Sequence, residues 1–444
     1  MALPPWTIEV LRRGLTDAAR KASEPQTLEK IKSQATEILQ ELPHTAARHL
    51  DAVLRSAEAG KRSVEQWSRE HSAIAIPMLN ASGILIHEFG TGVPLPDKVL
   101  DVGRELISGD VVQGEAEQAR LAKRIQRLLS SSQDHSLLIT ASFSAAMTAF
   151  SLLVQRRNLV VHRGHSVALP DGTPLPEAFQ TLVPLIQEVG SINRIDPHDF
   201  DGLNSFCAIF ADGGTNPIVP LDLSNHDAQQ AAVLPLATLQ ASEFEQIPSA
   251  EEMINQGIDY VMMPGNGLAA GPNCGMLLGP TEEIEWIRNS TAWSSLRASD
   301  ALQGMMVVAL EEAASNPSNL PVQALLSTNE ENLRGRAERL ATRLSAIDTI
   351  RSCQITADEA RLTSTGRWRF PSRQLCLQHQ TLTPTQWGEQ LREEVPSIEA
   401  SITGDQLKID LRWISPADDR KIAAAFGEVG HGNNEADTPE ANAE

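Results

Sequence analysis

The sequence has few cysteines, and they lie far apart. Its 444 residues include four, none of which forms a CxxC motif or a Cys/His cluster: Cys207, Cys274, Cys353 and Cys376. This spacing argues against a zinc site and against a disulfide framework. A charged start with a following apolar run and cleavage site is also missing, and no apolar run approaches the roughly 20 residues that span a bilayer. We therefore expect a soluble protein in a reducing, cytoplasmic setting with no membrane contact.

Positive charge is also scarce. The formal net charge is −20 and the pI is about 5.0, which disfavours a general nucleic-acid binder because such proteins need clustered Lys and Arg. Residues 1–75 are the exception, with 11 basic and 10 acidic side chains. Contact with tRNA is permitted there, although an ordinary solvated helix face is the simpler interpretation.

The hydrophobic pattern divides the chain into four parts. Apolar residues at helical spacing predict a helical N-terminal domain over 1–75. Seven short apolar runs between helical stretches predict a large α/β domain over 76–320 with a mostly parallel sheet. A long helical pattern and alternating segments predict a small α+β domain over 321–426. Residues 427–444 have almost nothing apolar to bury, which predicts a disordered acidic tail.

One predicted strand runs into a helix through small hydroxyl residues, in "LITASFSAAMTAF" (138–150). Free N–H groups and the dipole at the start of a helix make a seat for an anion, commonly a phosphate. Thr140, Ser142 and Ser144 are the candidate ligands. Helix capping alone would also explain these residues.

Two other predicted strands are followed by polar residues. Arg163 and His165 leave one strand, and Asn193 and Arg194 lie just beyond another. Open α/β sheets bind ligands at such strand ends, so these side chains are candidates for a binding site. His165 could stack on a planar ring or move a proton. Ordinary turn chemistry with solvated side chains is the alternative.

Six stretches in order and at matching spacing resemble one family, the bacterial selenocysteine synthases (L-seryl-tRNA(Sec) selenium transferases). They are "LNASGILIHEFGTGVPLP" (79–96), "RGHSVALPDGTPLPEAF" (163–179), "EVGSINRID" (188–196), "PGNGLAAGPNCGMLLG" (264–279), "SSLRASDALQG" (294–304) and "SITGDQLKIDLRWISPADDRKIAAAF" (401–426). The resemblance implies a fold-type-I, aspartate aminotransferase-like architecture that binds pyridoxal phosphate (PLP). It also implies a homodimer or larger homo-oligomer, with tRNA held by the N-terminal domain.

The chain departs from this family where the cofactor chemistry matters most. PLP enzymes of this kind hold the cofactor through a lysine Schiff base, and a carboxylate holds its ring nitrogen. The resemblance aligns the lysine with Gly267, and it aligns Pro235 roughly with the carboxylate. Shifting the alignment does not restore the amine, because no lysine lies between Lys123 and Lys408. Arginine cannot substitute, since a guanidinium stays protonated.

Several cations expected from the family are missing as well. The basic run before the first large-domain helix is "QGEAEQA" (113–119), and the arginine expected soon after His87 is Gly92. The features that survive are turns and part of a polar lining, including Gly190, Gly271 and Arg297. The glycine-rich segment thus keeps the turn of a covalent cofactor site without its amine.

Three interpretations remain open. The first is a catalytically degenerate relative (a pseudoenzyme) that binds an anionic small molecule or non-covalent PLP. The second is an active PLP-dependent L-seryl-tRNA(Sec) selenium transferase, or a related PLP lyase or transferase. Its PLP would be held non-covalently, as an external aldimine, or through Lys98 or Lys123 of the same or a partner chain. The third is unrelated chemistry at the same pocket, with His165 or Cys274 as the reacting group. For the candidate pocket we predict the residues Thr140, Ser142, Ser144, Arg163, His165, Asn193, Arg194, Gly267, Gly271 and Arg297.

Overall fold

The computed structural model describes residues 76–429, except for 87–92, 110, 111, 113, 130–133, 170, 171, 181, 184 and 365. The described residues from Pro77 onward belong to one unit, which contains all the elements below. The predicted helical domain over 1–75 and the tail over 430–444 lie outside the described residues. No helix in the described part has the length and apolar character needed to cross a bilayer.

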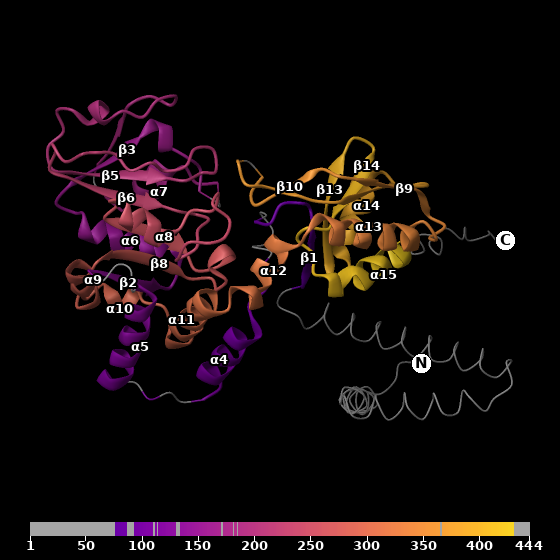
Figure 1. Ribbon diagram of the computed structural model, residues 1–444, viewed down its shortest axis with the longest axis horizontal. Coiled ribbons are helices and arrows are strands. Elements are labelled where there is room, and N and C mark those ends of the chain that lie inside the picture. The colour runs from indigo at the N-terminus through magenta and orange to yellow at the C-terminus, as the bar shows by residue number, and fades with distance from the viewer. Residues whose placement is uncertain are drawn as a thin grey trace, which may run out of the picture. The chain divides into compact units, whose positions relative to one another are not determined.

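A seven-stranded, mostly parallel sheet forms the larger half of this unit (Figure 1). The strand order is β2-β8-β7-β6-β5-β3-β4, and only β8 of these strands runs antiparallel to its neighbours. All seven predicted apolar runs contribute a strand, so the predicted sheet is confirmed. The strands are β2 (His135–Thr140), β3 (Asn158–His162), β4 (Ile186–Val189), β5 (Phe206–Ala211), β6 (Ala228–Val233), β7 (Tyr260–Pro264) and β8 (Gly275–Pro280).

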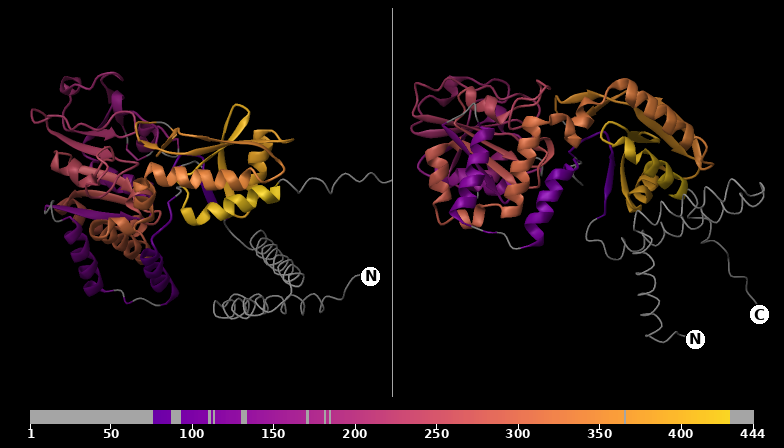
Figure 2. Two further views of the ribbon diagram at one scale, coloured as in Figure 1. Left: turned by 45° about the vertical axis from the view of Figure 1, so that its right-hand side comes forward. Right: turned by 60° about the horizontal axis from the view of Figure 1, so that its bottom comes forward.

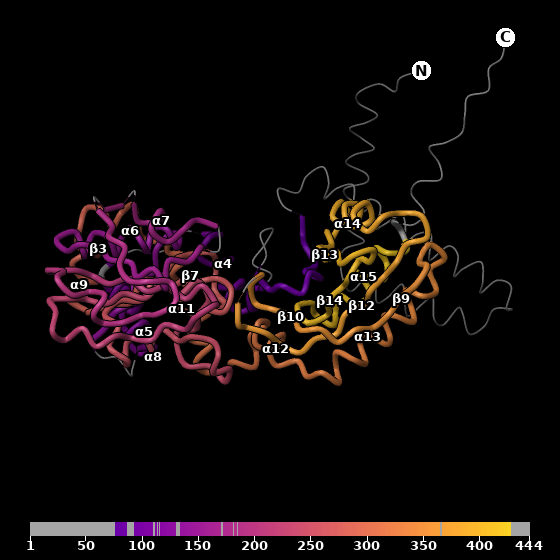
Figure 3. Tube along the Cα trace, turned by 90° about the horizontal axis from the view of Figure 1, so that it is seen from above, coloured from indigo at the N-terminus to yellow at the C-terminus, as the bar shows by residue number. Residues whose placement is uncertain are grey.

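Helices cover both faces of this sheet, which explains why its central strands are apolar on both sides. In β5, Phe206, Ala208 and Phe210 enter one core cluster, while Cys207, Ile209 and Ala211 enter the other. Figure 3 shows α6 and α7 on one side of the strands and α5, α8 and α11 on the other. The helices of this part are α4 (Asp97–Ser108), α5 (Glu115–Leu128), α6 (Phe143–Leu153), α7 (Leu175–Gln180), α8 (Ala250–Asn255), α9 (Thr281–Arg288), α10 (Trp293–Leu296) and α11 (Asp300–Ser315).

A second sheet has five strands in the order β1-β13-β14-β12-β9. Figure 2 shows helices of this region, in orange and yellow, lying against its strands. The alternating segment "QLCLQH" (374–379) forms β12. The elements are β1 (Met78–Ala81), α12 (Pro321–Ser327), α13 (Glu330–Leu344), β9 (Ile350–Thr356), β10 (Glu359–Arg361), β11 (Arg369–Pro371), β12 (Gln374–His379), α14 (Pro384–Glu393), β13 (Ser397–Thr403), β14 (Gln406–Asp410) and α15 (Asp419–Val429).

Two predicted domain boundaries need correction. The large domain was expected to begin at residue 76, yet β1 pairs in parallel with β13 of the five-stranded sheet, from Met78 against Ser397 to Ala81 against Ala400. A four-residue strand carries no sequence signal of its distant partner. The acidic tail was expected to begin at residue 427, but α15 continues to Val429 because Phe426 is buried and anchors its last turns.

Candidate functional site

The candidate site lies at the carboxyl edge of the seven-stranded sheet, where β2, β3, β5 and β7 end. Ligands of open α/β sheets bind at this edge. The predicted residues fall into separate groups along it. Thr140 is the last residue of β2 and Ser142 follows it, His165 follows β3, and Gly267 and Gly271 lie in the turn after β7.

The backbone conformation and close packing of the turn after β7 require its glycines. Gly267 has a φ of +68°, a left-handed conformation that favours glycine, and it opens the short 3₁₀ turn η3 (Gly267–Ala269). A Cβ atom at Gly271 would lie 2.4 Å from Met306 Sδ, and one at Gly265 would lie 2.3 Å from Cys274 Sγ. The position that the family resemblance assigns to the lysine is therefore a buried glycine in a closely packed turn.

The turn after β2 is held mainly by its own hydrogen bonds. The Thr140 hydroxyl donates to the Ser142 carbonyl oxygen at 2.9 Å, and the Ser142 hydroxyl accepts from the Ala145 N–H at 3.1 Å. Ser142 is thus the N-cap of α6, as the capping interpretation expects. Ser144 is exposed one position into the helix. Gly275 of β8 packs beneath, since a Cβ atom there would lie 2.2 Å from the Ser142 carbonyl oxygen.

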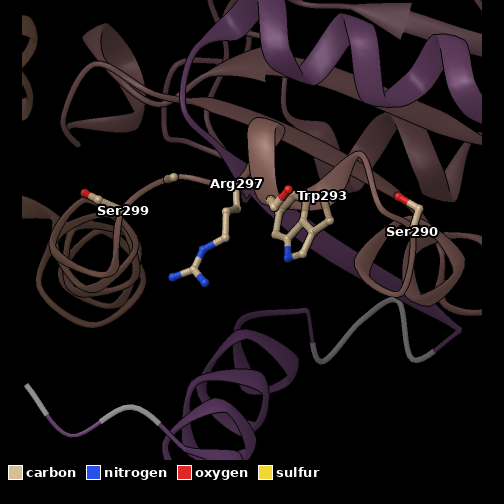
Figure 4. Close-up of a pocket in the computed structure, with 6 residues that line it drawn as sticks. Ser290, Trp293, Arg297 and Ser299 are labelled. Carbon is tan, nitrogen blue, oxygen red and sulfur yellow. The ribbon is translucent and has the colours of Figure 1, made fainter.

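Arg297 lies beside this turn. The strand-like segment around it bridges to Thr140, and the Ala141 N–H donates to the Leu296 carbonyl oxygen at 2.8 Å. An open depression of about 550 Å³ adjoins Arg297. Figure 4 shows the Arg297 guanidinium and the Trp293 indole directed to the same side of their segment. The lining residues are Ser290, Trp293, Ser294, Arg297, Ala298 and Ser299.

The chemistry of this depression suits an anion. Arg297 forms an ion pair with Asp300 and is about one-third exposed, so part of its guanidinium faces solvent. The Ser299 hydroxyl caps α11 and accepts from the Leu302 N–H. The Ser290 and Ser294 hydroxyls donate to the Ile287 and Thr291 carbonyl oxygens. The donors that can reach a bound group are therefore the Ser299 hydroxyl and the Trp293 indole N–H. Among the predicted residues, Arg297 alone is in the lining of this depression, and Thr140 adjoins it through a backbone bridge.

His165 lies farther along the edge and is 1% exposed. Its Nδ1 lies 3.0 Å from the Ala211 carbonyl oxygen, which can only accept, so Nδ1 carries the hydrogen. Nε2 then presents a lone pair, and it is buried with no partner among the described residues. Burial lowers the pKa of His165, which keeps the imidazole neutral. Phe210 packs against the ring edge-on, with centroids 5.3 Å apart.

A carboxylate that the sequence analysis did not single out follows β5. The Asp212 side chain is 1% exposed and pairs with both terminal nitrogens of Arg367, at 2.8 and 2.7 Å. Asp212 carries the same signal as Arg163, a charged residue directly after a buried strand. Arg367 had no such signal, because it lies 155 positions away in the sequence.

The remaining predicted residues sit on the exposed side of the edge. Arg163 donates to the Gly190 carbonyl oxygen at 2.8 Å, and Arg194 pairs with Asp196 while remaining 79% exposed. Asn193 is exposed in the same loop. These three side chains thus lie in or beside the turn after β4, and the lining of the Arg297 depression does not include them.

Three side chains invoked by the alternative interpretations are poorly placed. Burial raises the pKa of the Cys274 thiol to about 12, so little thiolate is present near neutral pH. The Lys98 ammonium pairs with Glu312 of α11, and Lys123 is exposed on α5. Both lysines belong to helices that pack against α11 rather than to a turn at the carboxyl edge.

Comparisons with known proteins agree with this architecture. The family model described as L-seryl-tRNA selenium transferase matches residues 231–415. The L-seryl-tRNA(Sec) selenium transferase of Aquifex aeolicus is 22% identical over 381 residues, covering 79% of this chain and 84% of the relative. The enzyme of that name from Moorella thermoacetica is 24% identical over 437 residues, covering 89% and 87%.

A solved structure is similar in fold. A D-glucosaminate-6-phosphate ammonia-lyase superposes with a TM-score of 0.57 at 17% identity, covering 80% of this chain and 96% of that one. At this identity the likeness concerns the fold alone. The predicted fold class, the α/β fold of the fold-type-I PLP-dependent enzymes, is confirmed.

Proposed function

The chain belongs to the L-seryl-tRNA(Sec) selenium transferase family, and from that premise we propose that it is a catalytically degenerate member. Its proposed role is to bind an anionic small molecule, or PLP without a covalent bond, at the carboxyl edge of the seven-stranded sheet. This role is one of binding and includes no catalytic step.

One observation carries the proposal, which is the glycine at position 267. A covalently bound PLP needs a primary amine, and the family resemblance places that amine in the turn after β7. Gly267 supplies none, and its φ of +68° is a conformation that lysine adopts at a cost of about 1 kcal/mol or more. The residues present therefore do not fit a Schiff-base cofactor, and the proposed role involves no reaction through PLP.

The residues do fit a non-covalent anion beside β2. Arg297 supplies a positive charge, and the Ser299 hydroxyl and the Trp293 indole N–H in the same lining can donate hydrogen bonds. An arginine can bind a phosphate through two parallel hydrogen bonds, which makes it a strong single contact for such a group. The depression could therefore hold inorganic phosphate or the phosphate of PLP.

A titration of the full-length protein with PLP tests both parts of the proposal. We expect saturable binding that dialysis reverses, and no lysine peptide that retains the cofactor after borohydride reduction and mass spectrometry. A stoichiometric, borohydride-stable adduct on Lys98, Lys123 or any other lysine would refute the degenerate interpretation. It would favour the alternative, an active PLP-dependent transferase or lyase.

Removing the charge at Arg297 tests the location. Arg297→Gln should weaken binding of PLP and of inorganic phosphate by roughly 10- to 100-fold, the usual effect of losing a charge-assisted hydrogen bond. Arg334→Gln is the matched control, since Arg334 is 69% exposed on α13 and pairs with Glu338 on the same helix. Equal affinity in the two variants would place the ligand elsewhere.

Oligomerisation remains a proposal as well. Three large apolar side chains are exposed on or just after α4, namely Leu100, Ile107 and Val112, and the last two are more than 70% exposed. Exposed apolar side chains are typical of contact surfaces when they gather into a patch. We propose a homodimer or larger homo-oligomer, which sedimentation of the full chain would test. Binding of tRNA by residues 1–75 stays a prediction, because these residues lie outside the described part.

A further inference from the structure

A short segment between β10 and β11 is fastened to the carboxyl end of β5. The segment comprises residues 366–368, and we call it the strap. The Arg367 N–H donates to the Gly214 carbonyl oxygen at 2.7 Å. The Trp368 indole N–H donates to the Gln246 carbonyl oxygen at 2.8 Å. The strap therefore binds two loops of the seven-stranded sheet at once.

The strongest contact of the strap is electrostatic. Arg367 and Asp212 form a bidentate pair with nitrogen–oxygen distances of 2.8 and 2.7 Å. The Asp212 side chain is 1% exposed and that of Arg367 is 25% exposed. Arg367 also lies over the Trp368 ring, 4.5 Å from its centroid. A carboxylate this deeply buried needs a partner, because an unpaired charge there would lose its hydration without compensation.

Two glycines allow the strap to approach so closely. Gly214 has a φ of +85° and Gly366 a φ of +113°, both in the left-handed region. A Cβ atom at Gly214 would lie 2.6 Å from Trp368 Cζ3, and one at Gly366 would lie 3.1 Å from the Gly214 carbonyl oxygen. Shape and charge thus specify the same docked position.

Asp212, to which the strap is paired, lies at the carboxyl end of β5. Asp212 directly follows Ala211, whose carbonyl oxygen accepts from His165 at the edge where ligands of such sheets bind. A pocket of about 320 Å³ reaches both Asp212 and Arg367 and continues over hydrophobic residues of the seven-stranded part. Among its described lining residues Arg367 is the one basic side chain, beside the acidic Glu245 and Glu252. In the docked state its guanidinium is already committed to Asp212.

From these contacts we propose that the Asp212–Arg367 pair is a latch that holds the strap closed over the end of β5. The closed latch is an autoinhibitory contact, because it commits the Arg367 guanidinium to Asp212 and so withholds from an anionic ligand the one basic side chain among the described lining residues of the 320 Å³ pocket. Opening frees Arg367 to face that pocket. The latch itself stands independently of the proposed function, whereas its effect on ligand binding rests on that function.

Hydrogen–deuterium exchange of the full-length protein tests the latch directly. The double substitution Asp212→Asn with Arg367→Gln removes both charges, so no buried charge is left unpaired. Peptides that contain the strap and residues 212–216 should exchange roughly 10- to 100-fold faster, the factor expected from losing a charge-assisted pair. Peptides from α13 should keep their wild-type rates. Unchanged exchange at the strap would overturn the proposal.

Two further variants separate the latch from a general loss of structure. Arg369→Gln removes a charge on the neighbouring strand β11. Arg369 pairs with Glu359, and both side chains are exposed, so this variant should leave exchange at the strap unchanged. Gly214→Ala forces a Cβ atom against Trp368 and should open the strap without altering any charge. If Arg369→Gln had the same effect as the double variant, the Asp212 pair would not be a specific latch.

The ligand-linked part is tested with PLP as the probe. Asp212→Asn alone removes the partner and keeps the Arg367 charge, so this variant should bind PLP more tightly than wild type, by roughly 10-fold or more, whereas the double variant should not. If strap exchange rises while PLP affinity does not, the latch exists but is not autoinhibitory. If no variant binds PLP, the proposed function fails, and the exchange data still decide whether the latch exists.

Discussion

Replacing Gly190 by alanine should destabilise the protein far more than the same change at an otherwise similar glycine. Gly190 has a φ of +69° in the turn after β4. A Cβ atom there would lie 1.9 Å from His162 Nε2 and 2.6 Å from its Cδ2. The imidazole cannot easily move aside. Its Nδ1 accepts from the Gly164 N–H at 3.0 Å, and its Nε2 lies 3.0 Å from the Asp199 carboxylate.

Three contributions set the size of the effect. Holding alanine in the left-handed region costs about 1 kcal/mol. Displacing a packed ring costs about 1–3 kcal/mol. Losing one hydrogen bond of the fully buried His162 adds about 1 kcal/mol or more. We expect Gly190→Ala to lower the free energy of unfolding by about 3–5 kcal/mol.

Gly202→Ala is the matched control, because Gly202 has a φ of +82° and no heavy atom of the described residues within 4 Å of a Cβ position. It should cost only the backbone contribution of about 1 kcal/mol. Urea denaturation followed by circular dichroism measures both variants against wild type. Equal losses of stability would refute the claim that contact with His162 requires the glycine.

Two other predictions concern titratable groups. Burial lowers the pKa of His379, whose Nδ1 accepts from the Thr381 and Leu382 N–H groups. The unfolded chain therefore binds this proton more readily, and stability should fall as the pH drops below about 6.5. Urea midpoints measured across this range should show a shallower decline in His379→Gln, and an unchanged slope would contradict the assignment. Burial raises the pKa of Cys274 to about 12 and that of Cys353 to about 11. Iodoacetamide at mildly alkaline pH should label both far more slowly in the native protein than in urea, with Cys274 the slower, and rapid native labelling of Cys274 would restore it as a candidate nucleophile.

The sheet was predictable because its signal is local. The run "FCAIFA" is apolar at every position, which only a strand covered on both faces requires, and all six residues of β5 are buried. The capping role of Ser142 was likewise one of two interpretations available from its local sequence. The glycine-rich segment after β7 was also predictable as a turn from its local sequence. In the structure, a Cβ atom at two of its glycines would collide with a sulfur atom.

The rest depends on contacts between distant residues. Asp212 could have been found from its place after an apolar strand, but the Arg367 guanidinium that holds it comes from another sheet region. Nothing in the local patterns ranks the predicted polar residues against one another. Arg297 and Arg194 both follow apolar segments, yet Arg297 lines a depression while Arg194 is almost fully solvated beside Asp196.

The pairing of β1 with β13 has a consequence for how the chain is made. Met78 leaves the ribosome long before its partner Ser397, and the whole seven-stranded sheet is synthesised between them. Domains generally fold in the order in which they are translated. The β1 segment therefore stays unpaired while the complete seven-stranded sheet forms after it. Assembly of the five-stranded sheet is therefore confined to the last stage of synthesis, and a truncated chain that stops before β13 would expose β1 to pairing with other molecules.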